Sequence, residues 1–370
     1  MTTLFSSTDH ALMARALQLA ERARYTTRPN PMVGCVLAHG DRVVGEGWHQ
    51  RRGHAHAEVL ALAAAGDQAR GATAYVTLEP CAHTGSTGPC ARALEAAGVA
   101  RVVAAMRDPF PQVDGRGLDL MRAAGIAVEV GLMEAQARAL NRAFLSRIER
   151  GRPWLRIKLA MSLDGRTALA GGESKWITGE ASRRDVMHWR ASSGALLTGS
   201  GTVLADNPAL TVRLDASTDV VPPLRVVLDP GLATVARGRI REGDAPTLYL
   251  HAPDTKPPRD LAAERAAVAT VAGGALDLNA VLALLAARGI GEVQVEAGAT
   301  LAGAFLRAGL VDELLLYVAP VLLGDRARPL FDGLGIDAMA QRLQLAIVET
   351  VRVGEDLRLR LAPTAAGAVR

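Results

Sequence analysis

The chain has 370 residues, enough for two ordinary domains that each bury a hydrophobic core. Hydrophobic residues make up 49% and charged residues 22%, and the net charge is only +4, which indicates a soluble globular protein without an extensive nucleic-acid-binding surface. No apolar run reaches the ~20 residues needed to cross a membrane, and the N-terminus lacks a signal-peptide pattern. We therefore expect a cytoplasmic location, and three cysteines make a disulfide framework an unfavourable interpretation.

The first 150 residues alternate between predicted helices and strands. In chain order the patterns predict a helix over 9–24, a hairpin of strands 33–38 and 42–48, a helix over 54–65, a strand over 72–78, a helix over 89–97, a strand over 101–106 and helices over 118–124 and 134–148. Residues 150–153 (RGRP) have the composition of a linker. We therefore expect one domain over residues 1–150 and a second over 151–370.

The second domain restarts the alternation with a strand over 154–160. Further strands are predicted over 196–198, 224–228, 247–250, 293–296 and 314–318, and helices over 179–190, 278–288 and 300–308. This alternation predicts a mostly parallel sheet covered by helices, so the fold class is α/β with two domains. Strand 314–318 could line the interface of a homo-oligomer, but a central strand is the interpretation we favour. Residues 215–258 are rich in Pro, Asp and Gly and give no firm boundaries.

Four residues of the first domain form a pattern with a specific chemistry. His56, Cys81 and Cys90 can fill three positions of a tetrahedral zinc ion and leave the fourth open for water, which is typical of a catalytic zinc site. Glu58 lies two residues after His56, close enough to transfer protons without binding the metal. A His-x-Glu followed by Pro-Cys is the signature of zinc-dependent nucleobase deaminases.

The ligand set predicts a hydrolytic deamination. Zinc lowers the pKa of bound water from about 16 toward 7 and so supplies hydroxide at neutral pH, which would attack a ring carbon that carries an amine. Glu58 would take the water proton, protonate a ring nitrogen and help ammonia leave. A structural zinc would instead need a fourth ligand, which His54 or His83 could supply, although His54 lies two residues before His56, a poor helical spacing for one metal.

The spacing of the cysteines departs from that of most nucleobase deaminases, which place two residues between them. Here eight residues (82–89) intervene, and segments 79–85 (EPCAHTG) and 88–90 (GPC) resemble the deaminase domain of bacterial bifunctional riboflavin-biosynthesis enzymes. Segments 29–34 (PNPMVG) and 45–49 (GEGWH) also match that family. The resemblance implies a cytidine-deaminase-like three-layer domain in which Glu58 is catalytic, His56, Cys81 and Cys90 bind zinc, and Asn30, His49 and His83 contact the pyrimidine.

Three polar segments follow predicted strands of the second domain. Residues 156–165 (RIKLAMSLDG) run from a strand into a turn, residues 199–208 (GSGTVLADNP) read as a polar, glycine-rich loop, and residues 296–303 (EAGATLAG) open a helix. Glycines let backbone N–H groups approach an anion, and a helix N-terminus favours phosphate. None of the segments is the Gly-x-Gly-x-x-Gly fingerprint, which disfavours a Rossmann domain.

These segments resemble the reductase domain of the same bifunctional family, whose fold is similar to dihydrofolate reductase, so the resemblance covers residues 7–361. It implies NADPH as a second cofactor, contacted by Ala160, Trp176, Thr202, Asp206, Gly298, Ala299, Thr300, Leu301, Ala302 and Gly303. It implies that the substrate is held by Ser174, Arg190, Leu210, Arg213 and Glu296. Arg190 and Arg213 suit a ribose phosphate, because a guanidinium gives bidentate, charge-assisted bonds to it. Asp206 and Lys158 both remain open as proton donors.

The two halves together predict an enzyme that acts twice on one small molecule, a pyrimidine ribose phosphate. We expect deamination of 2,5-diamino-6-ribosylamino-4(3H)-pyrimidinone 5′-phosphate, then NADPH-dependent reduction of the ribosyl group to give 5-amino-6-ribitylamino-uracil 5′-phosphate. One alternative is a nucleoside or tRNA deaminase fused to an unrelated domain, which predicts a two-residue cysteine spacing and a basic, aromatic surface. Another is a zinc-stabilised RNA-binding scaffold, which predicts four zinc ligands and a strongly basic face.

Overall fold

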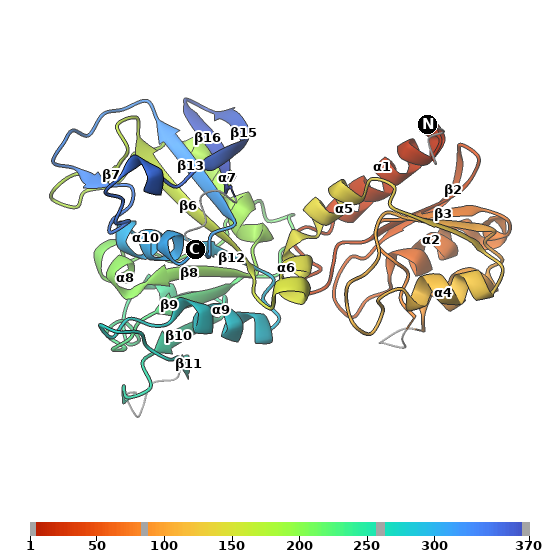
Figure 1. Ribbon diagram of the computed structural model, residues 1–370, viewed down its shortest axis with the longest axis horizontal. Coiled ribbons are helices and arrows are strands. Elements are labelled where there is room, and N and C mark those ends of the chain that lie inside the picture. Colours follow the sequence, from red (N-terminus) through yellow and green to blue (C-terminus); the bar gives the residue numbers. More distant parts are fainter. Residues whose placement is uncertain (1–4, 83–87, 257–262, 365–370) are drawn as a thin grey trace. The chain divides into compact units, whose positions relative to one another are not determined.

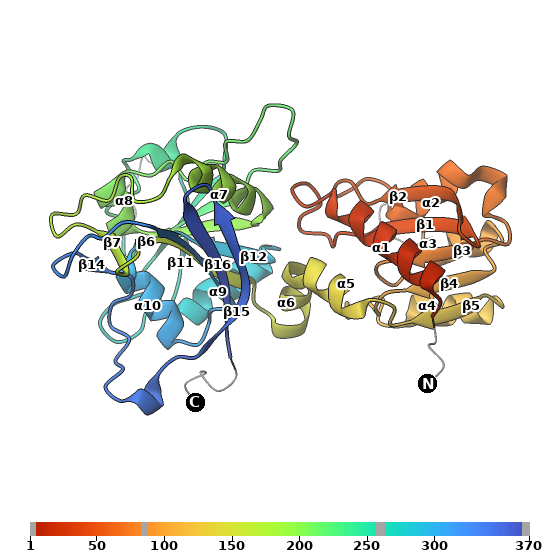
Figure 2. The same cartoon turned by 90° about the horizontal axis from the view of Figure 1, so that it is seen from above.

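The structure is a computed structural model that describes residues 5–82, 88–256 and 263–364. The chain divides into two compact units, Met1–Gly151 and Arg152–Arg370, each built around its own sheet (Figures 1 and 2). Among the described residues, no helix has the length and apolar character that crossing a membrane requires.

The first unit contains a five-stranded sheet with the order β2-β1-β3-β4-β5. Its strands are β1 (Gly34–His39), β2 (Arg42–Trp48), β3 (Thr73–Val76), β4 (Arg101–Ala104) and β5 (Ala127–Val130). Strands β1 and β2 form the predicted antiparallel hairpin, β1 is also antiparallel to β3, and β3, β4 and β5 are parallel. The carboxyl ends of β3 and β4 therefore lie at one edge of the sheet.

Helices cover both faces of this sheet, as predicted for a three-layer domain. On one face lie α1 (Ser7–Glu21), α5 (Glu134–Leu140) and α6 (Arg142–Arg150), and on the other α2 (Ala57–Ala65), α3 (Cys90–Ala96) and α4 (Arg116–Ala123), with the short 3₁₀ helix η1 (Gly66–Ala69) after α2. Figure 1 shows α1 and α5 above the sheet and α2 and α4 below it. Two separate hydrophobic clusters, one on each face, hold these layers together.

Two helix predictions in this unit are wrong in detail. The helix predicted over 134–148 is two helices, because Asn141 leaves the helical conformation and its side chain accepts a hydrogen bond from the N–H of Met32 (2.8 Å) and donates one to the Met32 carbonyl (2.9 Å). The helix predicted to begin at residue 54 begins at Ala57, with His56 as its N-cap. The first difference lets the Asn141 side chain bind the backbone of Met32. The second places His56, a predicted zinc ligand, just before the first turn of α2.

Helix α2 lies unusually close to strand β2 because two glycines on one face of the strand carry no side chain. A Cβ atom on Gly45 would lie 2.2 Å from the carbonyl oxygen of Ala61, and one on Gly47 would lie 2.4 Å from that of Ala57. Residues i and i+2 of a strand point to the same side, so both glycines face α2. This close approach fixes the first turn of α2, which carries Glu58 and follows His56.

The second unit contains a nine-stranded sheet with the order β11-β10-β9-β8-β12-β6-β13-β16-β15. Its strands are β6 (Trp154–Ser162), β8 (Ala195–Gly199), β9 (Leu224–Leu228), β10 (Thr247–His251), β11 (Glu264–Ala267), β12 (Glu292–Val295), β13 (Glu313–Ala319), β15 (Leu345–Val353) and β16 (Asp356–Pro363). All neighbours are parallel except β13–β16 and β16–β15, so the predicted mostly parallel sheet is confirmed and the antiparallel C-terminal hairpin was missed. Strand β13 is central and fully buried, as favoured. A small sheet pairs β7 (Arg166–Ala168) with β14 (Arg328–Pro329).

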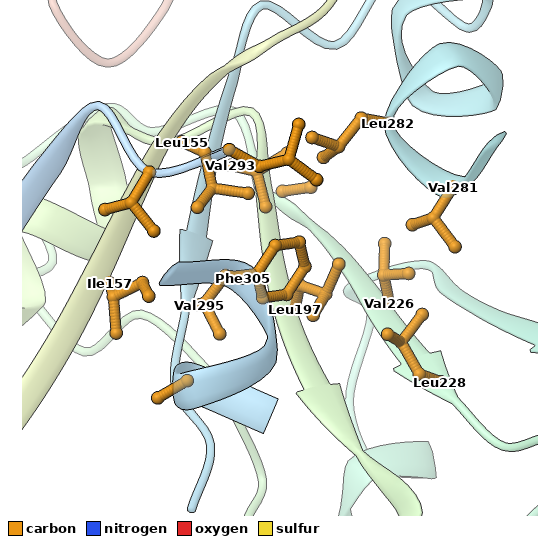
Figure 3. Packing of buried hydrophobic residues seen from close by; sticks show 14 of the residues in the cluster. Leu155, Ile157, Leu197, Val226, Leu228, Val281, Leu282, Val293, Val295 and Phe305 are labelled. Atoms are coloured by element: carbon orange, nitrogen blue, oxygen red, sulfur yellow. The ribbon is translucent and has the colours of Figure 1, made fainter. Parts of the chain in front are cut away.

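Helices α9 (Leu278–Ala287) and α10 (Ala299–Arg307) pack on one face of this sheet, and α7 (Glu180–Ser192) and α8 (Ser200–Asp206) pack on the other. Figure 3 shows Phe305 of α10 packed beside Leu197 and Val295 of the sheet, with Leu282 of α9 nearby. Two 3₁₀ helices, η2 (Arg239–Arg241) and η3 (Met339–Gln341), complete the unit. The prediction of a loop over 199–208 is wrong, because residues 200–206 form α8, which buries Val203 and ends at Asn207 with a φ of 45°.

We predict that Gly47→Ala destabilises the first unit by about 1–3 kcal/mol, because the added methyl group overlaps the backbone of α2. Urea denaturation measures the loss of unfolding free energy. Gly171→Ala is the control, since a Cβ there meets no atom within 4 Å and its φ is not left-handed. Equal stability of the two variants would contradict the role of the close approach.

Candidate functional site

The three predicted zinc ligands come together at the edge of the first sheet. His56 precedes α2, Cys90 is the first residue of α3, and Cys81 follows β3, so two of the three lie at helix N-termini. Their ligand atoms all lie within 4.8 Å of one another, with His56 Nδ1 3.2 Å from Cys90 Sγ and 3.6 Å from Cys81 Sγ. Ligands at ordinary Zn–N and Zn–S lengths in a tetrahedron are about 3.6 Å apart, so the donor set fits zinc.

The alternative of a structural zinc site requires a fourth ligand beside His56, Cys81 and Cys90. His54 is exposed and is not part of the cluster, and no fourth His, Cys, Asp or Glu ligand joins it in the part of the chain that the structure describes. His83 lies outside the described residues, so its predicted pyrimidine contact has no structural description. With the three described ligands alone, a tetrahedral zinc ion would keep one position for water, as in a catalytic site.

Glu58 lies beside the cluster and is almost fully buried, at 3% exposed. Burial raises the pKa of its carboxyl group to about 7. The pKa of the neighbouring Cys81 thiol is lowered to about 4, mainly by a hydrogen bond with the Cys90 thiol. A carboxyl group that titrates near neutrality can both accept and donate a proton at physiological pH, which is what general acid–base catalysis needs.

A cavity of about 220 Å³ opens onto this cluster and contains the predicted pyrimidine contacts Asn30 and His49. His49 Nδ1 lies 3.1 Å from the carbonyl oxygen of Ala55, which can only accept, so Nδ1 donates. Nε2 then accepts from the Asn30 amide at 3.1 Å. Because burial lowers the pKa of His49, the ring is neutral and fixed in one tautomer, and it in turn orients Asn30.

Three charged residues around this cavity were missed from the sequence. Glu79 is buried and accepts backbone N–H groups of Gly115 (3.0 Å), Gly117 (2.9 Å) and Asp108 (3.2 Å), so its carboxylate organises the loop that follows β4. Asp108 lines the cavity, and burial raises its pKa to about 6. Arg147 of α6 lines it as well. The available signal was position, since Glu79 directly follows the predicted strand 72–78 and Asp108 lies two residues after the predicted strand 101–106, whereas nothing local singles out Arg147.

The second unit has a much larger cavity of about 1700 Å³, reached by the segments that follow β8, β9 and β12. This is the carboxyl edge of the parallel strands, the usual position of a ligand site in such a sheet. Its lining includes the predicted residues Ala160, Ser174, Trp176, Arg190, Thr202, Asp206, Leu210, Arg213, Glu296, Gly298, Ala299, Thr300 and Leu301. Ala302 and Gly303 do not line it, because both are buried in α10, and a Cβ on Gly303 would lie 2.1 Å from the carbonyl oxygen of Asp332.

Arg190 and Glu296 form a bidentate ion pair in this cavity, with N–O distances of 2.7 Å from both Nε and Nη2. Burial would raise the pKa of Glu296, but Arg190 and Lys158 together hold it at about 2. Arg190 also donates to the carbonyl oxygen of Thr211 (2.9 Å), so three of its donors are already used within the protein. Lys158 lines the cavity beside this pair, and burial lowers its pKa.

Trp176 presents a large exposed aromatic face to the cavity, at 70% exposed. The guanidinium of Arg183 lies 4.5 Å from its ring centroid and donates to the carbonyl oxygen of Thr178 (2.7 Å). An exposed indole held by a neighbouring cation offers a flat surface on which a planar ring can stack. The geometry thus provides for an aromatic ligand at this position.

Comparison with protein families assigns each unit separately. Residues 6–106 match the cytidine and deoxycytidylate deaminase zinc-binding region, and residues 153–359 match the RibD C-terminal domain. The first match contains all three zinc ligands, and the second contains all the predicted reductase residues. Zinc and NADPH are the cofactors of this domain combination.

Whole-chain comparison agrees with the domain matches. The chain is 49% identical to the riboflavin biosynthesis protein RibD of Escherichia coli (strain K12), over 95% of this chain and 99% of that protein, and 46% identical to RibD of Haemophilus influenzae, over 97% and 98%. It superimposes on the structure of Acinetobacter baumannii RibD (form 1) with a TM-score of 0.90, at 46% identity over 96% of this chain and 99% of that one. The deaminase/reductase structure from Thermotoga maritima gives a TM-score of 0.85 at 31% identity, over 96% and 99%. The chain belongs to the RibD family and is a bifunctional deaminase and reductase of riboflavin biosynthesis.

Proposed function

We propose that the two steps are divided between the units, with deamination in residues 1–150 and reduction in residues 151–370. The substrate is a small pyrimidine. Deamination comes first and reduction second, in the order expected from the sequence. The observation that carries the proposal is the presence of two separate cavities, one at a three-ligand metal cluster and one at the carboxyl edge of a parallel sheet. A cytoplasmic location, the absence of nucleic-acid and membrane partners, and assembly into a homo-oligomer stay predictions.

In the deaminase site, the His56, Cys81 and Cys90 side chains would hold a zinc ion, which when bound would supply an activated water for attack on the ring carbon. Glu58 takes a proton from the water, passes it to a ring nitrogen and then assists departure of ammonia. Its buried position keeps the carboxyl group away from bulk water, so that its proton exchanges with the substrate. The neutral ring of His49 holds Asn30, and this pair orients the pyrimidine edge.

In the reductase site, the residues that line the large cavity would hold NADPH, which when bound would supply the hydride for the ribosyl carbon. Trp176 offers a stacking surface, and the first turn of α10, which begins at Ala299, offers a phosphate backbone N–H groups that have no acceptor within the helix. Arg213 is exposed, and among the described residues its one hydrogen bond is to the Thr211 hydroxyl (3.1 Å), so it suits the substrate phosphate better than Arg190 does. We assign Arg190 instead to holding Glu296 in place against the substrate.

We predict that Glu58→Gln lowers the deamination rate by about 10²–10⁴-fold while zinc content stays unchanged, because the amide is isosteric but cannot carry the proton. Ammonia release and metal analysis measure the two quantities. Reduction of the separately supplied deaminated intermediate is the control and should keep its wild-type rate. Substantial ammonia release by this variant would remove Glu58 from the mechanism.

Removal of zinc with a chelator should abolish ammonia release and leave NADPH oxidation with the deaminated intermediate intact. The reason is that the metal cluster and the large cavity belong to different units of the chain. Added zinc should restore deamination. Parallel loss of both activities would show that the reductase also depends on the metal.

Trp176→Ala should weaken NADPH binding by about tenfold, because it removes an exposed aromatic surface from the cavity. The dissociation constant is measured by NADPH fluorescence without substrate, and deamination serves as the folding control. Met339→Ala is a matched exposed substitution outside the cavity lining. Unchanged NADPH affinity in the Trp176 variant would refute the assignment.

A further inference from the structure

Arg147 is the one lysine or arginine among the described residues that line the zinc cavity. It lies in the last turn of α6, and its Nε is buried without a hydrogen-bond partner. Its guanidinium has no ion pair in the described structure, and its one described contact is with the ring of Phe144, 6.0 Å from the centroid. Burial lowers its pKa. The cavity thus contains a cation that forms no ion pair with the described residues and whose buried Nε has no hydrogen-bond partner among them.

Three other partly or fully buried arginines of the chain form ion pairs with carboxylate groups. Arg101 pairs with Asp9 and Glu129, Arg156 with Glu292 and Glu313, and Arg190 with Glu296. Removing a guanidinium from water without a partner is costly, so an unpaired one at a cavity wall indicates that the partner comes from a ligand. The guanidinium fork matches the oxygens of a phosphate.

The carboxyl groups of the cavity do not pair with Arg147. Three of them line it, Glu58, Glu79 and Asp108, and none forms an ion pair with this guanidinium in the described structure. A substrate that carries a 5′-phosphate therefore needs a compensating cation in this cavity, and Arg147 is the residue placed to supply it.

We infer that Arg147 binds the 5′-phosphate of the substrate during deamination, separately from the phosphate contact at Arg213 in the reductase cavity. The inference rests on the deaminase function proposed above. It makes Arg147 a specificity-determining residue, because it separates the phosphorylated pyrimidine riboside from the same riboside without phosphate. The pyrimidine contacts and the proton transfer at Glu58 do not depend on it.

The test compares the phosphorylated substrate with the corresponding dephosphorylated riboside in the deaminase assay of the full chain. Arg147→Gln should raise KM for the phosphorylated substrate about 10- to 100-fold with little change in kcat, a loss of about 1.4–2.8 kcal/mol. The affinity of the riboside should not change, measured as KM or, where turnover is slow, as a competitive inhibition constant. Arg147→Lys should recover part of the loss, and inorganic phosphate should inhibit the wild type more strongly than Arg147→Gln.

Arg150→Gln is the matched control, since Arg150 lies on the same helix, is exposed and does not line the cavity. Zinc content and the reductase rate with the deaminated intermediate check the fold of every variant. An unchanged KM for the phosphorylated substrate, or an equal loss for substrate and riboside, would overturn the inference. Absence of ammonia release by the wild type would instead overturn the deaminase function itself.

Discussion

The burial of charge is the constraint on which the rest of this structure depends. A charged group inside a protein must be paired, hydrogen-bonded or neutralised, because desolvation costs several kcal/mol. Glu79 meets this requirement with backbone N–H groups, and Glu296 meets it with Arg190. In the deaminase cavity the solution is different: burial raises the pKa of Glu58 to about 7, and Arg147 keeps unused donors. The carboxylates of Glu79 and Glu296 are thus compensated although both line a cavity, whereas Arg147 has no ion-pair partner among the described residues.

The hydrogen bonds and ion pairs that compensate these buried charges also position the loops of both sites. The carboxylate of Glu79 gathers the segment after β4, which brings Asp108 to the zinc cavity. Arg190 ties the carboxyl end of β12 to the carbonyl oxygen of Thr211 and so links two walls of the reductase cavity. These contacts join residues far apart in the sequence. The two cavities therefore depend on buried polar contacts as much as on hydrophobic packing.

Several elements could be predicted from local pattern, and others could not. The β1–β2 hairpin and the parallel strands of the second sheet have apolar runs bounded by turn residues, and both are confirmed. Helix α8 was missed because its glycine-rich start has low helix propensity, which its packing through Val203 overrides. The break at Asn141 was missed because its cause is the backbone of Met32, more than 100 residues away. Strand β15 lacks a clean alternation and is largely exposed, so it carried little signal.

The sequence by itself determined the chemistry: the zinc ligands with Glu58, the family to which the two halves belong, and the order of the two domains. These features are motifs, in which residue type and spacing suffice because the reaction requires them. Only the tertiary structure decided that Arg190 is occupied by Glu296, that Ala302 and Gly303 are buried away from the large cavity, and that Arg147 faces the zinc cavity unpaired. Whether a charge is free or paired depends on neighbours that only folding brings together, and no local pattern records them.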